Sequence, residues 1–114
     1  MLKKEILRRK DDFDLIYKKG RSIGEKYIVL FYKKNQLSYN RTAFLASKKV
    51  GNSVERNRAR RLMKENYRFL KDRMKTGYDL IFIARNTIKD QKSYDVGKSM
   101  NRAVTKGKLY REER

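Results

Sequence analysis

Residues Lys48 to Arg61, KKVGNSVERNRARR, lie where a predicted strand gives way to a predicted helix. The small residues of the Gly51-Asn52-Ser53 turn interrupt the apolar pattern. Asn52 is a good N-cap, and Glu55, three residues later, completes a capping box, although Ser53 is a near-equal alternative cap. This stretch therefore predicts that a helix begins at the turn.

The same stretch carries two lysines and four arginines in fourteen positions. A helix that starts after such a turn presents free backbone N–H groups and the positive end of its dipole, and both attract phosphate. From Lys48 to Lys75 there are eleven Lys or Arg residues and three acids, so the helix cannot be neutralised by its own salt bridges. We expect an external polyanion to bind here.

The helix has two faces, and we expect it to end at Gly77. Its predicted core stripe comprises Ala59, Leu62, Met63, Asn66 and Leu70. The other stripe is mostly charged and comprises Arg58, Arg61, Glu65 and Arg68. One face therefore packs on a sheet, and the other meets solvent or ligand.

The rest of the chain supplies strands and two more helices. Strands are predicted at 27–32, YIVLFY, and at 42–47, TAFLAS, and we expect these two to form an antiparallel pair. A third strand is predicted at 78–84, YDLIFIA, with both faces buried. A short strand at 21–23 is predicted only weakly. Helices are predicted at 12–19, with Phe13, Ile16 and Tyr17 on one face, and at 93–106, with Val96, Met100, Ala103 and Val104 on one face. This order predicts an α+β fold, a two-layer α/β sandwich in one domain of residues 1–114 whose tail frays from about residue 107.

Charge and composition narrow the function. The 114 residues include 32 Lys and Arg against 13 Asp and Glu, a net charge of +19, which favours nucleic acid over the alternatives of an anionic membrane or acidic proteins. No apolar run reaches the ~18 residues that span a bilayer, and no signal peptide is evident, so we expect a cytoplasmic protein.

Histidine and cysteine are absent. The usual general base, metal ligands and activated nucleophiles are therefore missing, which argues against catalysis by the polypeptide alone. The acids are scattered, and a carboxylate-held metal is disfavoured against solvated surface charge.

The chain resembles the protein subunit of bacterial ribonuclease P, the ribonucleoprotein that trims the 5′ leader from precursor tRNA. KKVGNSVERNRARRL is similar to the family signature, whose RNR motif corresponds to Arg56-Asn57-Arg58. Three further segments stand in the order expected for the family: DFDLIYKKG near the N-terminus, SKK at the start of the signature and LIFIAR after it. The resemblance implies a small mixed sheet of the ribosomal protein S5 domain 2-like type. It also implies a left-handed strand-helix-strand crossover, with the last two long strands parallel.

The resemblance also implies a division of labour within the enzyme. The RNA subunit would carry the endonucleolytic chemistry and hold most of the Mg²⁺, while the protein would bind the catalytic RNA and precursor tRNA, with no obligatory protein partner and no membrane. Carried over residue by residue, the RNA-binding positions are Lys48, Lys49, Asn52, Ser53, Arg56, Asn57, Arg58, Arg60, Arg61 and Lys64. The leader-binding positions are Phe13, Tyr17 and Phe31, with Lys18 and Lys33 beside them.

Other interpretations of these residues stay open at this point. The three aromatic rings are also consistent with ordinary core packing, and a slip of one residue would turn Leu30 or Tyr32 outward instead of Phe31. A ribosomal or general RNA-binding protein without a processing role fits the same charge and fold. An autonomous nuclease is a third class, which requires cleavage by the protein alone.

Overall fold

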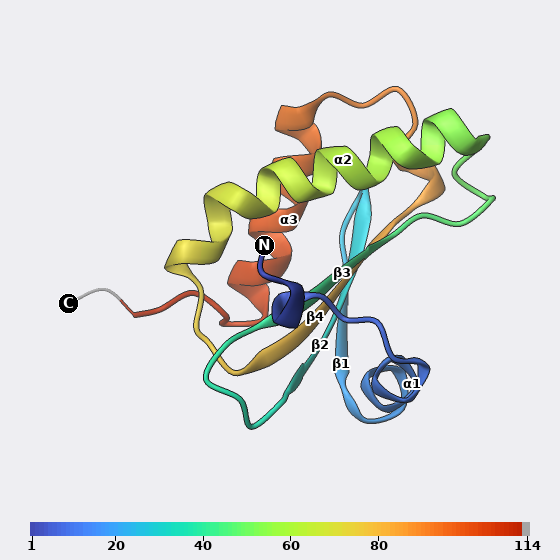
Figure 1. Cartoon of the computed structure of the whole chain (residues 1–114). Helices are drawn as coiled ribbons and strands as arrows, with labels where there is room; N and C mark the ends of the chain where they lie inside the picture. Colours follow the sequence, from blue (N-terminus) through green and yellow to red (C-terminus); the bar gives the residue numbers. More distant parts are fainter. Residues whose placement is uncertain (113–114) are drawn as a thin grey trace.

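The computed structural model describes residues 1–112 and shows a four-stranded sheet with helices on both faces (Figure 1). The longer elements are α1 (Lys10–Lys19), β1 (Arg21–Gly24), β2 (Ile28–Lys34), β3 (Arg41–Leu45), α2 (Ser53–Leu70), β4 (Tyr78–Ala84) and α3 (Ser93–Lys106). Three short 3₁₀ turns are η1 (Lys3–Glu5), η2 (Lys71–Arg73) and η3 (Asn86–Ile88). The α+β class is confirmed, and the weakly predicted strand at 21–23 is β1.

The strand order is β1-β2-β4-β3. β2 is antiparallel to both β1 and β4, and β3 is parallel to β4. The predicted antiparallel pairing of residues 27–32 with 42–47 is therefore wrong, because β4 lies between these strands. The apolar side chains on both faces of β4 favour a central position, where both faces are covered.

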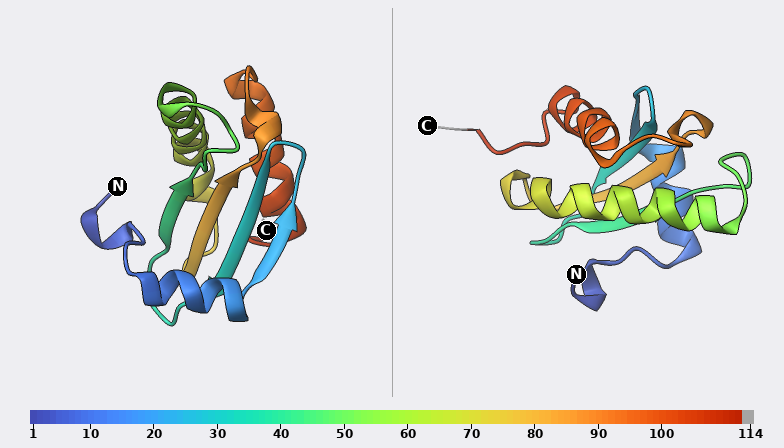
Figure 2. Two further views of the ribbon diagram at one scale, coloured as in Figure 1. Left: turned by 90° about the vertical axis from the view of Figure 1, so that its right-hand side faces the viewer. Right: turned by 90° about the horizontal axis from the view of Figure 1, so that it is seen from above.

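The crossover from β3 through α2 to β4 is left-handed. In the left view of Figure 2, α1 lies in front of the sheet, β3 (green) stands to the left of β4 (gold), both run upward, and α2 passes behind. This hand is rare among parallel crossover units. The expectation drawn from the family resemblance is confirmed.

The helix α2 begins where the sequence predicts and ends earlier than expected. It stops at Leu70, not at Gly77, and η2 follows. Leaving the helix lets Met74 take an extended backbone and bury its side chain in the core. Gly77 instead has a φ of 91°, which favours glycine in the turn before β4.

The main core lies between the sheet and the layer formed by α2 and α3. Leu30, Leu80, Phe82, Met63 and Met100 are fully buried there. The predicted apolar residues of both helices face this core, and Tyr67, which the prediction omitted, joins them with its ring beside Phe44 and Phe82. Packing of α2 on this core presents its opposite face to solvent.

Residues 107–111, part of the tail for which we expected fraying, lie against the fold, and residues 113–114 of that tail lie outside the described residues. Leu109 is buried, and its carbonyl accepts a hydrogen bond from the backbone N–H of Lys75 at 2.7 Å. The backbone N–H of Arg111 donates to the carbonyl of Arg73 at 2.8 Å. No helix among residues 1–112 is long and apolar enough to cross a membrane.

Candidate nucleic-acid interface

The N-terminus of α2 is held by side chains that the sequence stretch itself supplies. The Asn52 side chain accepts a hydrogen bond from the Glu55 backbone N–H, and the Glu55 carboxylate accepts one from the Asn52 backbone N–H, both at 2.9 Å. Asn52 is thus the cap, and Ser53 is the first helical residue. Because both bonds are local, they fix where α2 starts and how its arginines are phased.

Three of the predicted RNA-binding arginines make hydrogen bonds within the fold. Arg56 Nη1 donates to the carbonyl of Gly51 at 2.9 Å. Arg58 Nη2 donates to the carbonyl of Gln91 at 2.6 Å, and Arg60 Nη1 donates to the carbonyl of Ala46 at 3.5 Å. Arg58 therefore points toward the loop before α3, whereas Arg60 points toward the chain that follows β3.

The remaining predicted RNA-binding residues are exposed. Those on the turn and the outer face of α2 are Lys48, Lys49, Asn52, Ser53, Asn57, Arg61 and Lys64. We call the ten predicted positions between Lys48 and Lys64 the basic patch. The structure brings them together around the first three turns of α2, in agreement with helical spacing.

The basic patch keeps its charge unneutralised. Within residues 1–112, five ion pairs form, and none involves a patch residue. The one acid inside the stretch, Glu55, pairs with Lys89 at 3.2 Å. Hydrogen bonding to the Asn52 backbone, followed by that to Lys89, holds the pKa of Glu55 below its ordinary value. The patch can therefore accept a polyanion without breaking an ion pair among the described residues.

The three predicted leader-binding aromatics meet on the opposite side of the sheet. The ring of Tyr17 lies edge-on to Phe31, with centroids 5.0 Å apart, and 6.4 Å from the ring of Phe13. Phe31 faces α1, whereas Leu30 and Tyr32 lie on the α2 and α3 side. We call Phe13, Tyr17 and Phe31 the aromatic face.

The aromatic face is only partly buried. Tyr17 is 42% exposed, and Phe13 and Phe31 are half-buried against a small cluster that includes Ile16 and Ile81. Partial burial raises the pKa of the Tyr17 hydroxyl. The rings therefore contribute to packing and still offer edges and faces to a ligand.

A partly buried ion-pair network centred on Arg41 ties α1 to the sheet, and the sequence analysis missed it. Arg41 donates to both carboxylate oxygens of Asp79, at 2.8 and 2.7 Å, and to Asp12 of α1 at 3.3 Å. These hydrogen bonds, first those to Asp79, raise the pKa of Arg41. The signal was Asp79 itself, because an acid inside the apolar run YDLIFIA needs a buried partner.

The two surfaces define a class of protein: a small, strongly basic α+β protein with a cationic helix for a polyanion on one side and an aromatic face on the other. Comparison with known proteins identifies its family. The family described as Ribonuclease P matches residues 1–108.

Individual relatives agree with the family match. The ribonuclease P protein component of Alkaliphilus metalliredigens is 42% identical over 103 residues, covering 90% of this chain and 93% of that protein. The same component of Clostridioides difficile is 43% identical over 99 residues, covering 86% and 87%. The chain belongs to the family of ribonuclease P protein components, which makes it a subunit of an endoribonuclease.

Solved structures show the same fold. A Staphylococcus aureus RNase P protein mutant with defective mRNA degradation activity superposes with a TM-score of 0.88 at 30% identity, covering 95% of this chain and 92% of that one. The RNase P protein of Thermotoga maritima gives 0.81 at 27% identity, covering 90% and 96%.

Proposed function

We propose that this subunit docks on the catalytic RNA of ribonuclease P through the basic patch and holds the single-stranded 5′ leader of precursor tRNA on the aromatic face. The proposal is carried by one observation, the separation of two unlike surfaces. Cations that form no ion pair within residues 1–112 lie on α2, and clustered, partly exposed rings lie on the other side of the sheet. A protein that only coats RNA needs the first surface and not the second.

Arginine suits the docking role of the basic patch. A guanidinium can bridge phosphate oxygens with two parallel hydrogen bonds, whereas lysine acts as a point charge. Arg61 is exposed on the outer face of α2, where such a contact can form. Arg56 and Arg60 are held beside it by carbonyls of the chain before the helix, so their positions are preset.

The aromatic face suits an unpaired leader. Base–aromatic stacking contributes about 1–3 kcal/mol per base with little sequence preference, since every base has a π-face. The Arg41 bridge between Asp12 and Asp79 fixes α1 against the sheet and so holds Tyr17 edge-on to Phe31. Leaders of different sequence are therefore acceptable ligands.

In this proposal the RNA subunit carries out phosphodiester hydrolysis and holds most of the magnesium. The described residues contain no cluster of three or more acidic side chains that could hold a metal ion. The protein's part is to bind, to orient the leader and to lower the magnesium concentration that cleavage requires.

The test compares precursor and mature tRNA binding to the enzyme reconstituted with its RNA subunit. Tyr17→Ala and Phe13→Ala should weaken precursor binding about 5- to 150-fold, the equivalent of about 1–3 kcal/mol, and leave mature tRNA unchanged. Tyr94→Ala is the matched control, because Tyr94 is an exposed tyrosine on α3. Equal losses of affinity for precursor and mature tRNA would indicate that these rings serve packing and do not bind the leader.

The alternative of a general RNA-binding protein makes a different prediction for the same preparation. Such a protein would bind RNA with the same salt dependence but would not reduce the magnesium that the RNA subunit needs to cleave precursor tRNA. Cleavage by the purified protein without RNA would instead indicate an autonomous nuclease.

A further inference from the structure

A cationic hollow lies beside the end of α3, on the side of the sheet that α2 and α3 cover. Arg21 of β1 pairs in register with Tyr32 of β2, and two residues further along β2, Lys34 pairs in register with Tyr78 of β4. Because side chains alternate along a strand, all four lie on one face of the sheet. Gly107, at the end of α3, completes this side of the hollow, whose volume is about 360 Å³. Both tyrosine rings pack against the main core, so the hollow lies on the side opposite to the aromatic face.

The lining of the cationic hollow carries four positive charges and no carboxylate. The cations are Lys19, Arg21, Lys33 and Lys34. None of them makes an ion pair within residues 1–112. The acid that pairs in register with Lys33, Asp79, faces the other side of the sheet, where Arg41 binds it. Four like charges around one concavity repel one another, so a bound anion stabilises this arrangement.

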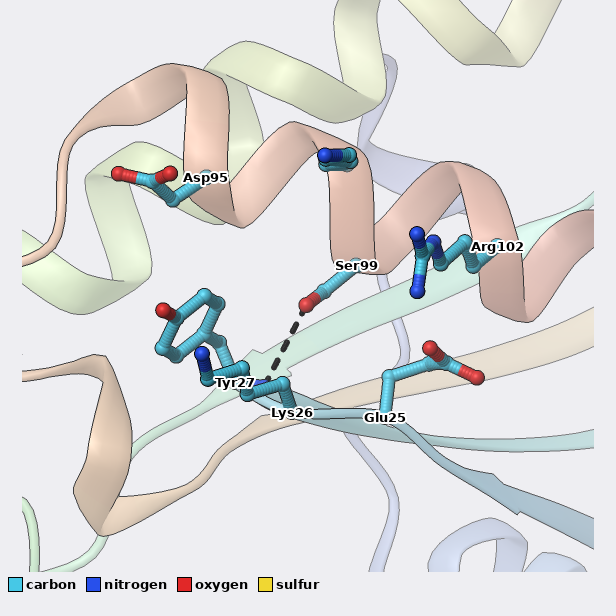
Figure 3. A pocket seen from close by; sticks show the side chains of 7 residues that line it. Glu25, Lys26, Tyr27, Asp95, Ser99 and Arg102 are labelled. Atoms are coloured by element: carbon cyan, nitrogen blue, oxygen red, sulfur yellow. Dashed lines mark hydrogen bonds between the residues drawn. The ribbon is translucent and has the colours of Figure 1, made fainter.

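Other hollows on the molecule differ in this respect. The hollow between α3 and the β1–β2 turn contains the cations Lys98 and Arg102. Its lining also includes the carboxylates of Glu25 and Asp95 (Figure 3). Three further hollows each have at least one carboxylate in their lining. The cationic hollow is thus the one of these five in which every charge favours phosphate.

The neutral groups of the cationic hollow also suit an anion. The rings of Tyr32 and Tyr78 lie 6.4 Å apart and are held by the main core. Neither hydroxyl has a hydrogen-bond partner among the described residues, so both O–H groups can donate to a ligand. The backbone N–H groups of residues 107–109 bind carbonyls in the last turn of α3, which reduces the repulsion between that helix end and an anion.

A glycine brings the end of α1 close to the cationic hollow. A side-chain carbon at Gly20 would lie 2.5 Å from the carbonyl oxygen of Ile16 and 2.7 Å from that of Tyr32, which is too close for any residue except glycine. The chain between α1 and β1 therefore passes directly against β2. Lys19 and Arg21, on either side of the glycine, are held beside the tyrosine wall by this contact.

The cationic hollow lies near one end of the sheet, and the basic patch begins near the other. Tyr78 and Ile83 are five residues apart on β4, which corresponds to about 17 Å. Ile83 pairs with Leu45, three residues before the patch begins at Lys48. One phosphate cannot contact both places, so a ligand of the hollow adds contacts to those of the patch.

We propose that the cationic hollow binds backbone phosphates of the catalytic RNA at a second place, separate from the basic patch. The inference rests on the proposed docking of the patch on that RNA. The hollow lies on the same side of the sheet as α2, whereas the aromatic face lies on the opposite side. An RNA that covers α2 can therefore extend to the hollow without crossing the leader site.

The experiment measures the affinity of the full-length protein for the catalytic RNA at several salt concentrations around 0.1 M. The variant is Arg21→Gln with Lys34→Gln, because both side chains are exposed and make no hydrogen bond among the described residues. Each lost phosphate contact lowers the affinity about five- to eightfold at 0.1 M salt and the salt slope by about 0.7–0.9. This double variant should therefore bind about 25- to 60-fold more weakly, with a salt slope lower by about 1.4–1.8.

The matched control is Lys98→Gln with Arg102→Gln, which removes the same two residue types and the same net charge from the hollow of Figure 3. The control should bind the catalytic RNA like the wild type, because carboxylates already balance these cations. Unchanged melting temperatures confirm that both double variants fold. Equal losses in the two double variants would assign the effect to net charge and overturn the inference, as would wild-type affinity of the Arg21/Lys34 variant.

The tyrosine hydroxyls provide a second test that does not change the charge. Tyr32→Phe with Tyr78→Phe removes two neutral donors, so the affinity should fall about two- to tenfold for each bond lost while the salt slope stays the same. Wild-type affinity of this variant, beside a loss in the Arg21/Lys34 variant, would assign the effect to charge acting at a distance and overturn the hollow as the site.

Two further arms separate this inference from its neighbours. If Arg61→Ala weakens binding of the catalytic RNA and the Arg21/Lys34 variant does not, the hollow is refuted while the proposed docking stands. If neither weakens binding, the proposed function itself fails. Titration with inorganic phosphate tests the other source of the same chemistry. Phosphate-induced NMR shifts at Tyr32 and Tyr78, with wild-type RNA affinity of the Arg21/Lys34 variant, would assign the hollow to a free anion and refute the assignment to RNA.

Discussion

Arg58 and Arg61 lie one turn apart on α2 in different surroundings, so their alanine variants separate RNA contact from fold stability. Arg61 is exposed and makes no hydrogen bond within the described residues, whereas Arg58 is half-buried and donates to the Gln91 carbonyl at 2.6 Å. We expect Arg61→Ala to act on RNA binding and Arg58→Ala to act mainly on stability.

The magnitudes follow from these surroundings. Arg61→Ala removes one phosphate contact, which lowers the salt slope by about 0.7–0.9 and the affinity about five- to eightfold at 0.1 M salt. Its free energy of unfolding should change by less than about 0.5 kcal/mol. Arg58→Ala breaks a charged hydrogen bond at a half-exposed site, worth about 1.5 kcal/mol, which lowers the melting temperature by about 6 °C in a chain of this size.

The assay combines thermal unfolding of the free protein with measurement of its affinity for the RNA subunit between about 0.05 and 0.2 M salt. Over this range the affinity of a protein with several phosphate contacts falls about tenfold or more, so the salt slope can be measured. The reasoning is refuted if Arg58→Ala lowers the salt slope as much as Arg61→Ala and leaves the melting temperature unchanged. That outcome would mean that Arg58 meets phosphate and that its bond to Gln91 does not stabilise the fold.

The remaining predictions concern the ion pair, the helix cap and the tyrosine ring. Asp79→Asn leaves the Arg41 charge without its main partner and should lower the free energy of unfolding by about 3 kcal/mol, as measured by urea denaturation; a loss under about 1 kcal/mol would contradict the assigned role. The lowered pKa of Glu55 contributes stability above the ordinary pKa of glutamate, and this stability is lost as the pH falls through the lowered value. Glu55→Gln should therefore remove part of the acid sensitivity of α2 in a circular-dichroism titration, and identical acid profiles would argue against the cap. Tyr17→Phe keeps the stacking surface and should bind precursor tRNA like the wild type; a loss as large as that of Tyr17→Ala would assign the effect to the hydroxyl.

The sequence by itself determined those features that depend on near neighbours along the chain. The start of α2 follows from Asn52 and Glu55, three residues apart, and the buried stripe of α2 follows from helical spacing. The net charge and the gathering of arginines on one helix are likewise properties of composition and period. The family resemblance supplied the left-handed crossover, which no spacing rule predicts.

Only the tertiary structure decided the features that depend on residues far apart in the chain. It placed β4 between β2 and β3, ended α2 at Leu70 so that Met74 could be buried, and turned Phe31 toward Tyr17. It also joined Arg41 to Asp79 and drew Arg58 to the Gln91 carbonyl while leaving Arg61 in solvent. Periodicity shows which face of its own helix or strand a side chain occupies. The residue that it contacts there depends on how the elements pack together. That packing is decided by burial and charge pairing between residues far apart in the chain.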